Sequence, residues 1–327
     1  MPLILSREQV RELLDMRAAI EAVEKGLVEF SSGQAVMPVR VATQVPAHAG
    51  LVLGMPAFLG ATDALGTKIV TVYKNNPPRG LPTIMAVVVI NDPRTGRVEA
   101  IMDGGYLTAV RTAAASAVGT KYLAKGDARV LGILGTGVQG ASHLWAMKEV
   151  LTGLRRVVVY NRTRDRAETF AQEMGARFGL PIGVLDSEEA VCRESDVLVL
   201  ATTATQPIVE RAWLKPGVHV NAVGSHSPGA RELDSDTVAD ARIVVDSREA
   251  NLAECGDLLI PMNEGRIGRE HFADEIGEVA AGRKPGRGSP EQITIYKSVG
   301  IAVEDVATGN LVYRRALEQG IGTRVEL

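Results

Sequence analysis

Two patterns of apolar and polar positions divide the chain. Beyond Arg129, short continuous apolar runs alternate with stretches in which apolar residues recur at helical spacing. Continuous runs of this length are typical of strands that are buried on both faces of a parallel sheet. The fold class expected here is α/β, a doubly wound sheet with strands at residues 130–134, 156–160, 196–202, 218–223 and 242–246.

The part of the chain before about Tyr122 has a different pattern. An amphipathic helix is expected from Ser6 to about Phe30, and alternating segments such as LVLGMPAF, TKIVTVYK and IMAVVVIN follow it. Residues 91–96 have the turn chemistry of a hairpin loop, so these strands are expected to be mostly antiparallel. After the parallel sheet, 282–290 is a glycine- and proline-rich loop, and 298–319 has the period of a long helix.

A glycine-rich segment, GTGVQG, separates the first parallel strand from the next helical pattern. Gly135, Gly137 and Gly140 have the spacing of a dinucleotide-binding loop. The first glycine permits a tight turn, the second lets the backbone approach a pyrophosphate, and the third lets the helix pack closely on the strand. The second strand ends about twenty residues past the last glycine, as such a unit requires. The segment therefore predicts a nucleotide site, with the helix N-terminus facing the phosphates.

The end of the second strand indicates which nucleotide is preferred. An acidic residue there would hold the ribose 2′-hydroxyl of NAD, but this chain has Asn161, Arg162, Thr163 and Arg164. Two guanidinium groups can bind a 2′-phosphate, and the amide and hydroxyl can add hydrogen bonds. We therefore expect NADP(H) to be preferred, with NAD(H) as the second coenzyme. The alternative is that Thr163 caps the following helix and both arginines are solvated surface charges.

Composition excludes several other classes of protein. The formal net charge of −3 and the mixed charge pattern offer no basic surface for nucleic acid. The N-terminus has no signal-peptide pattern, and no apolar run approaches membrane-spanning length, so a cytoplasmic location is expected. The histidines lack metal-ligand spacing, and Cys192 and Cys255 form no disulfide framework, so no metal is expected. Cys255 is interpreted as a small packed residue.

Several further motifs give the chain a resemblance to the ornithine cyclodeaminase/μ-crystallin family, and the similarity covers nearly its whole length. These motifs, besides GTGVQG, are MPVR at 37–40, GTKIVTVYKNNP from Gly66, GLPT at 80–83, DGGYLTAVRTAAASAVG from Asp103, AVGSHSPGARELD from Ala222 and ITIYKSVG from Ile293. The resemblance implies hydride transfer between a nicotinamide and the Cα of an amino or imino acid.

The resemblance also implies the division into domains. A Rossmann domain, residues 122–298, is inserted into a substrate-binding and dimerisation domain of residues 1–121, which residues 299–327 complete. The family forms homodimers through the sheets of that second, α+β domain. The expected partners are therefore a small imino or amino acid and a second copy of the chain, with no nucleic acid and no membrane.

Three basic residues within these motifs suit an α-imino acid substrate. Its carboxylate must be held rigidly, and guanidinium suits a planar two-oxygen grip, so Arg40 and Arg111 are candidates. Strand alternation puts Lys68 on the same face as Val70 and Val72, which turns it inward if that face is buried. A buried lysine has a lowered pKa and can exchange a proton, or it can hold the carboxylate. The alternatives are structural ion pairs for the arginines and a lysine that extends to solvent.

Coenzyme contacts are expected along the matched motifs and at the ends of the parallel strands. The resemblance places them at Thr83, Arg111, Gly135, Thr136, Gly137, Val138, Gln139, Gly140, Asn161, Arg162, Thr163, Arg164, Ala201, Thr202, Thr203, Val223 and Ser298.

His226 departs from the family pattern. In the ornithine cyclodeaminases the matching position is an aspartate that holds the amine, whereas GSHSPG has a histidine there. An imidazole can bind an imine nitrogen but cannot reproduce a fixed carboxylate beside a diamine. The alternative for His226 is a loop histidine that bonds to local backbone. We therefore expect an imino-acid reductase or amino-acid dehydrogenase, with Lys68 and His226 as catalytic candidates. The alternatives are a cyclodeaminase and a non-catalytic, μ-crystallin-like binding protein.

Overall fold

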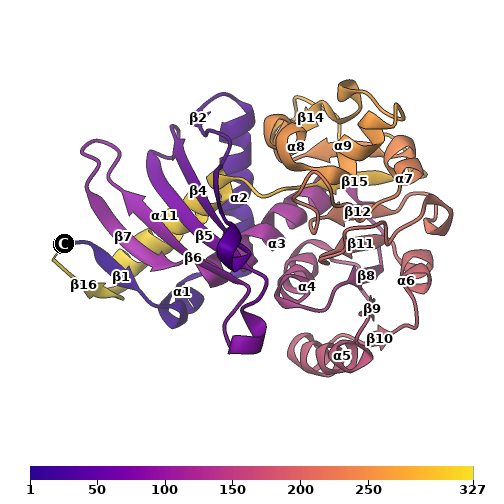
Figure 1. Cartoon of the computed structure of the whole chain (residues 1–327), viewed down its shortest axis with the longest axis horizontal. Coiled ribbons are helices and arrows are strands. Elements are labelled where there is room, and N and C mark those ends of the chain that lie inside the picture. Colours follow the sequence, from indigo (N-terminus) through magenta and orange to yellow (C-terminus); the bar gives the residue numbers. More distant parts are fainter. Residues whose placement is uncertain (327) are drawn as a thin grey trace. The chain divides into compact units, whose positions relative to one another are not determined.

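The computed structural model describes residues 1–326, which form two compact units (Figure 1). Unit 1 comprises Met1–Thr112 and Gly300–Leu327, and unit 2 comprises Ala113–Val299. The first boundary lies inside helix α3 (Gly104–Leu123), whereas the sequence motifs suggested a boundary near residue 122. Because this helix is continuous, nothing in the local pattern of apolar residues signals where one unit ends.

Unit 1 is built on a mixed sheet in the order β16-β1-β7-β6-β5-β4-β2, with β3 also paired to β4. Strands β4 to β7 run antiparallel, as their alternating sequences predict, while β1 joins β7 in parallel. The 91–96 segment does connect two hairpin strands. The strands are β1 (Leu3–Leu5), β2 (Ala35–Val36), β3 (Val41–Val45), β4 (Gly50–Leu59), β5 (Ala64–Tyr73), β6 (Ile84–Asn91), β7 (Val98–Asp103) and β16 (Thr323–Arg324).

The single helix expected from Ser6 to about Phe30 is two helices, α1 (Arg7–Leu13) and α2 (Met16–Ser31). The break follows from Asp15, whose carboxylate accepts a hydrogen bond from the N–H of Ala18 at 2.9 Å and caps a new helix. The first helix has a capping box between Ser6 and Gln9. Both helices bury an apolar face, so the apolar periodicity of the sequence continues through the break. Periodicity alone therefore did not reveal that there are two helices.

Helices α2 and α11 (Ala302–Gln319) pack together, and α11 lies against β4, β5 and β6 (Figure 1). The packing buries one row of each strand, including Ala64, Lys68 and Val70 of β5. On the other face, three apolar side chains in one row across the sheet are exposed, those of Val41, Ile69 and Val87. One face of this sheet is therefore a core, and the other is an uncovered apolar surface within this single chain.

Unit 2 contains a parallel sheet in the order β10-β9-β8-β11-β12-β15-β13-β14. The chain order reverses between β8 and β11, which is the point where open α/β sheets bind ligands. The strands are β8 (Val130–Leu134), β9 (Arg156–Tyr160), β10 (Ile182–Val184), β11 (Val197–Leu200), β12 (His219–Ala222), β13 (Arg242–Val245), β14 (Asp274–Glu275) and β15 (Thr294–Lys297). The doubly wound prediction is confirmed.

The helices of unit 2 connect these strands, and none of the helices in residues 1–326 has the length and apolarity needed to cross a bilayer. They are α4 (Val138–Val150), α5 (Arg164–Phe178), α6 (Glu188–Glu194), α7 (Ser235–Asp240), α8 (Arg248–Glu254), α9 (Gly256–Asn263) and α10 (Ile276–Ala280). Short 3₁₀ turns lie at Pro46–His48, Pro77–Arg79, Arg211–Trp213 and Arg269–Phe272. Three of the strands, β10, β14 and β15, were not expected as strands from sequence.

Candidate functional site

The glycine loop joins β8 to α4 with the geometry that its sequence predicts. Gly135 has a φ of +102°, and a Cβ atom there would collide with the carbonyl of Ala201. A Cβ atom on Gly140 would collide with the carbonyl of Gly135, so the helix and loop approach as closely as only glycine allows. Gly137, by contrast, has nothing within 4 Å of its Cβ position. The loop therefore presents open space at the N-terminus of α4, where a phosphate would fit.

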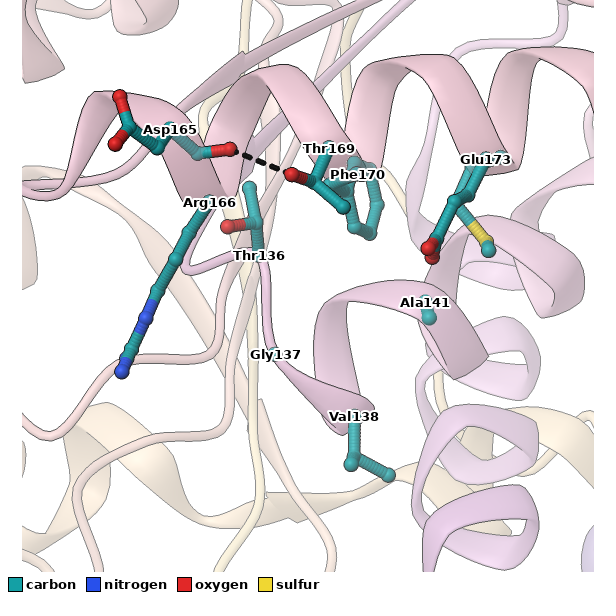
Figure 2. Close-up of a pocket in the computed structure, with 10 residues that line it drawn as sticks. Thr136, Gly137, Val138, Ala141, Asp165, Arg166, Thr169, Phe170 and Glu173 are labelled. Atoms are coloured by element: carbon teal, nitrogen blue, oxygen red, sulfur yellow. Dashed lines mark hydrogen bonds between the residues drawn. The ribbon is translucent and has the colours of Figure 1, made fainter.

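A cavity of about 430 Å³ lies between this loop and α5. Figure 2 shows Thr136, Gly137, Val138 and Ala141 on one side of it and residues of α5 on the other. Arg166 extends from the first turn of α5 next to Thr136. The remaining lining residues are Asp165, Thr169, Phe170, Glu173 and Met174. Sequence analysis did not single out Arg166, because it lies two positions beyond the residues that end the β9 segment.

The four predicted coenzyme contacts that follow β9, residues 161–164, differ in their hydrogen bonds and ion pairs. The Asn161 amide donates to Thr136 Oγ1 at 2.8 Å, and its oxygen accepts from the N–H of Thr163 at 2.9 Å. Thr163 occupies the N-cap of α5, but its side chain makes no capping hydrogen bond. Arg164 is exposed and pairs with Glu168 at 2.8 Å and Asp186 at 2.5 Å. Arg162 is exposed next to them, and within residues 1–326 no carboxylate forms an ion pair with it.

The other predicted coenzyme contacts in unit 2 lie at the carboxyl ends of β11, β12 and β15. Ala201 and Thr202 directly follow β11, Val223 follows β12, and Ser298 follows β15. Their backbones extend the sheet, since the N–H of Ala201 donates to Leu134 O at 2.9 Å and that of Val223 to Leu200 O at 3.0 Å. Thr203 is exposed one residue further on. Because the strands are parallel, these positions share one edge with the glycine loop.

His226 lies in the loop after β12 and is exposed. Its Nδ1 is 3.1 Å from the carbonyl oxygen of Gly224. A carbonyl only accepts, so Nδ1 carries the proton, and Nε2 is the acceptor of the neutral ring. This contact is the local backbone bond that the sequence left open as an alternative, and it fixes one orientation of the imidazole.

Lys68 is 1% exposed on β5, on the covered face of the unit 1 sheet. Its Nζ lies 2.7 Å from Asp305 Oδ2 of α11. Asp305 Oδ1 in turn accepts from Arg111 Nε at 2.9 Å, and Arg111 Nη1 donates to Glu304 Oε2 at 2.5 Å. Two cations and two anions thus form a buried cluster that joins β5, α3 and α11 within one unit.

The buried cluster changes the pKa of both Lys68 and Arg111. Burial and the neighbouring Arg111 charge lower the pKa of Lys68 to about 8, although Asp305 and Glu304 oppose that change. Burial also disfavours the charged form of Arg111, but the two carboxylates outweigh it and raise the pKa of Arg111 above its ordinary value. Lys68 is therefore a buried amine that can exchange a proton at moderately alkaline pH, while Arg111 stays charged.

The two remaining candidates of unit 1, Arg40 and Thr83, each lie directly before a strand of its sheet. Arg40 directly precedes β3, whose first residue, Val41, pairs with Gly54 of β4. Arg40 is half-buried. Thr83 precedes β6, and its carbonyl accepts from the N–H of Tyr73 at 2.8 Å.

Comparison with known proteins shows the family of the chain. A family model described as the ornithine cyclodeaminase/mu-crystallin family matches residues 1–320. The chain belongs to the ornithine cyclodeaminase/μ-crystallin family. Delta(1)-pyrroline-2-carboxylate reductase of Bacillus cereus is 40% identical over 328 residues, which cover 99% of each chain. This membership confirms the family resemblance that the motifs predicted.

Solved structures of the ornithine cyclodeaminase/μ-crystallin family share the same fold. The structure of Thermococcus litoralis Delta(1)-pyrroline-2-carboxylate reductase in complex with NADH and L-proline has a TM-score of 0.96 and 43% identity, covering 99% of this chain and 100% of that one. An archaeal alanine dehydrogenase dimer with bound NAD has a TM-score of 0.94 and 37% identity, with 99% of each chain covered.

Sequence analysis did not single out three acidic residues that contact predicted site residues or their loops. Asp305 and Glu304 neutralise Lys68 and Arg111, and Glu232 binds the backbone of Thr202 and Gly224. The only sequence signal was a charged pair, ED, within an otherwise apolar stretch of the last helix. Within residues 1–326, no group of three or more His, Cys, Asp or Glu side chains has the arrangement of a metal site.

Proposed function

We propose that this protein is an NAD(P)H-dependent imino-acid reductase, which in the reverse direction acts as an amino-acid dehydrogenase. The observation that carries the proposal is the similarity, over nearly the full length, to a reductase whose structure contains NADH and L-proline. The substrate class is a small α-imino carboxylate, with cyclic pyrroline and piperideine carboxylates as the first candidates. The site residues are consistent with this chemistry for the reasons below.

The glycine loop and the carboxyl ends of the unit 2 strands would hold the coenzyme. The open space at Gly137 and the N–H groups of α4 fit a pyrophosphate, and Asn161 and Arg162 would bind the adenosine ribose or its 2′-phosphate. Thr202, Thr203, Val223 and Ser298 lie where the nicotinamide half of a dinucleotide would extend. When bound, the reduced coenzyme supplies the hydride for the imine carbon.

NADP(H) is the preferred coenzyme in this proposal. No carboxylate follows β9 at the position that would repel a 2′-phosphate. Because Glu168 and Asp186 already neutralise Arg164, Arg162 is the side chain assigned to the phosphate. Arg166, which also lines the cavity, adds a second positive charge.

Lys68 and Arg111 are the substrate-directed groups of unit 1, together with Arg40. Arg111 keeps its charge and attracts the substrate carboxylate, although it must share its donors with Glu304 and Asp305. Lys68 has the lowered pKa that a proton donor needs at moderately alkaline pH. In this proposal Lys68, or a water bound to it, donates the proton that the imine nitrogen of the substrate receives.

His226 separates a reductase from a cyclodeaminase. With its Nδ1 proton bonded to Gly224, the ring offers an acceptor to the N–H of an iminium group. A cyclodeaminase requires a fixed negative charge beside a diamine, and this loop position does not supply one. Net reduction of an imine is therefore proposed over internal cyclisation of a diamino acid.

The test is a panel of imines with both coenzymes, in which loss of reduced nicotinamide is followed by absorbance. We expect stoichiometric NADPH consumption with pyrroline or piperideine carboxylates, or with pyruvate plus methylamine. L-Ornithine and L-lysine serve as controls, and neither should release ammonia. Proline and ammonia formed from ornithine with only catalytic coenzyme would instead establish a cyclodeaminase. Tight coenzyme binding without turnover of any imine would favour a binding protein.

The proposal includes a homodimer formed through the unit 1 sheet. Val41, Ile69 and Val87 form an exposed apolar row on β3, β5 and β6, and Met85 is exposed on the same face of β6. Contiguous apolar surfaces of this kind usually mark an interaction site. The archaeal alanine dehydrogenase of the same fold is a dimer, and a second copy of this chain is the proposed occupant.

A cytoplasmic location is also proposed. Cys192 and Cys255 are buried free thiols, and burial raises the pKa of each to about 12. Unpaired thiols without a disulfide framework suit a reducing compartment. Fractionation of the source cells, with the protein followed by antibody, would test the location.

A further inference from the structure

A second buried charged cluster lies in unit 2, beside the edge of the sheet to which the coenzyme is assigned. It consists of Glu232, Asp257 and Lys297, and none of the three side chains is exposed. Lys297 ends β15, Asp257 lies in the first turn of α9, and Glu232 belongs to the RELD segment after β12. The proposed function assigns no role to these residues, and three buried charges need an explanation.

The Glu232 carboxylate joins two loops. Its Oε1 accepts from the N–H of Thr202 at 2.9 Å and from Thr202 Oγ1 at 2.7 Å, and its Oε2 accepts from the N–H of Gly224 at 2.8 Å. Thr202 lies in the loop after β11, and Gly224 lies in the loop after β12 that carries His226. One side chain therefore fixes the separation of two segments to which nicotinamide and imine contacts are assigned.

The space around Gly224 shows how close this contact is. A Cβ atom there would lie 2.5 Å from Glu232 Oε1 and would also collide with the carbonyl of Thr202. A side chain at this position would push the two loops apart. The glycine in AVGSHSPG is thus needed so that the loop can lie directly on the carboxylate.

The rest of the cluster anchors Glu232 and the same loop. Lys297 Nζ donates to the carbonyl oxygens of Ala222 at 3.2 Å and Ser225 at 2.8 Å, and it lies 3.0 Å from Asp257 Oδ2. Asp257 Oδ1 accepts from the N–H of Glu232 at 2.7 Å. Lys297 therefore binds carbonyl oxygens at the end of β12 and in the loop that follows, while Glu232 binds an N–H group of the same loop.

We propose that Glu232 is a positioning residue that holds the loops after β11 and β12 in the arrangement required for coenzyme binding. The inference rests on the coenzyme site of the proposed function. All three hydrogen bonds to the carboxylate come from donors, so the ionised form satisfies them all. A protonated carboxyl has lost the charge that strengthens these contacts and has less acceptor capacity, so it binds the two loops more weakly.

The balance between the two forms lies near neutral pH. Burial and the neighbouring Asp257 charge raise the pKa of Glu232 to about 7, although Lys297 and the Thr202 donors oppose that change. The charged groups facing it are Asp257 from α9 and Lys297 from β15. Burial disfavours charged Lys297, but Asp257 together with Cys255 and Glu232 outweighs this and raises its pKa, so Lys297 stays charged. Loop positioning should therefore weaken as the pH falls through about 7.

The test compares Glu232→Gln with the wild type in NADH titrations at about pH 8.5 and about pH 6, on either side of the wild-type pKa. NADH is used because it lacks the titrating 2′-phosphate of NADPH. At the higher pH the variant should bind NADH roughly tenfold more weakly, since an amide NH₂ replaces one acceptor. At the lower pH the two proteins should bind about equally. Glu275→Gln is the matched control, because Glu275 is a buried carboxylate of the same unit on β14. Equal weakening at both pH values, or no weakening, would overturn the proposal.

Hydrogen exchange of the coenzyme-free proteins provides an independent measurement. Glu232→Gln should speed exchange in peptides containing Thr202 and Gly224 and leave those of β8 unchanged; a uniform increase would mean a merely structural role. If Glu232→Gln does not fold, Glu232→Asp is compared with the wild type in its place. It keeps the negative charge, so NADH binding should keep its pH dependence. Failure of the wild type to bind any coenzyme would contradict the proposed function, and hydrogen exchange would still decide the role of Glu232.

Discussion

Lys68 Nζ and Asp305 Oδ2 lie 2.7 Å apart in a fully buried ion pair that connects β5 to the last helix. The same carboxylate binds Arg111 through its other oxygen. Asp305 thus fixes both basic groups that the proposed reaction directs toward substrate. It also opposes the effect of burial on the pKa of Lys68, so that this amine stays partly protonated at the pH where it would act.

Replacement of Lys68 by alanine should remove turnover and spare coenzyme binding. Lys68 belongs to unit 1, whereas the residues assigned to coenzyme phosphates belong to unit 2. Loss of a proton donor should lower kcat/KM at least about 100-fold. Steady-state kinetics and an NADPH titration would measure the two effects. Wild-type turnover in the variant would exclude this role for Lys68.

The Asp305→Asn variant tests how Lys68 is tuned. With Lys68 as the proton donor, wild-type kcat/KM should fall as the pH rises through about 8. The Asp305 charge raises the pKa of Lys68, so its removal should move this alkaline limb to lower pH. Asp63→Asn, at an exposed carboxylate of the same unit, should leave the pH profile unchanged. An unmoved limb in Asp305→Asn would contradict the assignment.

Coenzyme choice should change when the segment after β9 is altered. Asn161→Asp combined with Arg162→Ala should shift preference toward NADH by roughly tenfold or more, because a carboxylate binds the 2′-hydroxyl and repels a 2′-phosphate. Arg164→Ala is the control and should have a smaller effect, since Glu168 and Asp186 neutralise Arg164. Titration of both coenzymes measures the shift. Tighter binding of NADH than NADPH by the unaltered protein would refute the expected preference.

His226→Ala should lower kcat/KM for imine reduction roughly tenfold or more, because the ring that orients the imine is lost. His226→Asp restores the cyclodeaminase pattern and should not restore the rate with a cyclic imine. Both variants should bind NADPH as the wild type does. Full activity in His226→Ala would mean that the Gly224 contact is the whole role of this histidine.

Val87→Arg should convert a dimer to a monomer. Val87 lies directly opposite Ile69 in the exposed row of the unit 1 sheet, so an arginine would place charges on the proposed interface. Leu317→Arg, at an exposed position of α11, is the control and should leave the dimer intact. Light scattering after size-exclusion chromatography gives the mass. A monomeric wild type would contradict the proposed interface.

Local sequence was sufficient wherever a feature depends on neighbours in the chain. The glycine spacing predicted the turn between β8 and α4, and alternation in TKIVTVYK predicted that Lys68 shares a face with Val70, which the structure shows to be buried. The antiparallel hairpin at 91–96 and the parallel strands after Arg129 followed from turn chemistry and apolar runs. Shared motifs indicated the family, which the full-length match confirms.

Tertiary structure alone decided which charges meet. Nothing near Lys68 in the chain indicates Asp305, and nothing near Thr202 indicates Glu232, because contacts between distant segments depend on how α11 and the loop after β12 pack. The same holds for β15, which enters the sheet between β12 and β13 although it follows both in sequence. Local sterics and periodicity determined the glycine turn, the hairpin and the first parallel strands, whereas β10, β14, β15 and the break between α1 and α2 were seen only in the structure. The ionisation of Lys68 and Glu232 was decided by burial and by partners that only folding brings into contact.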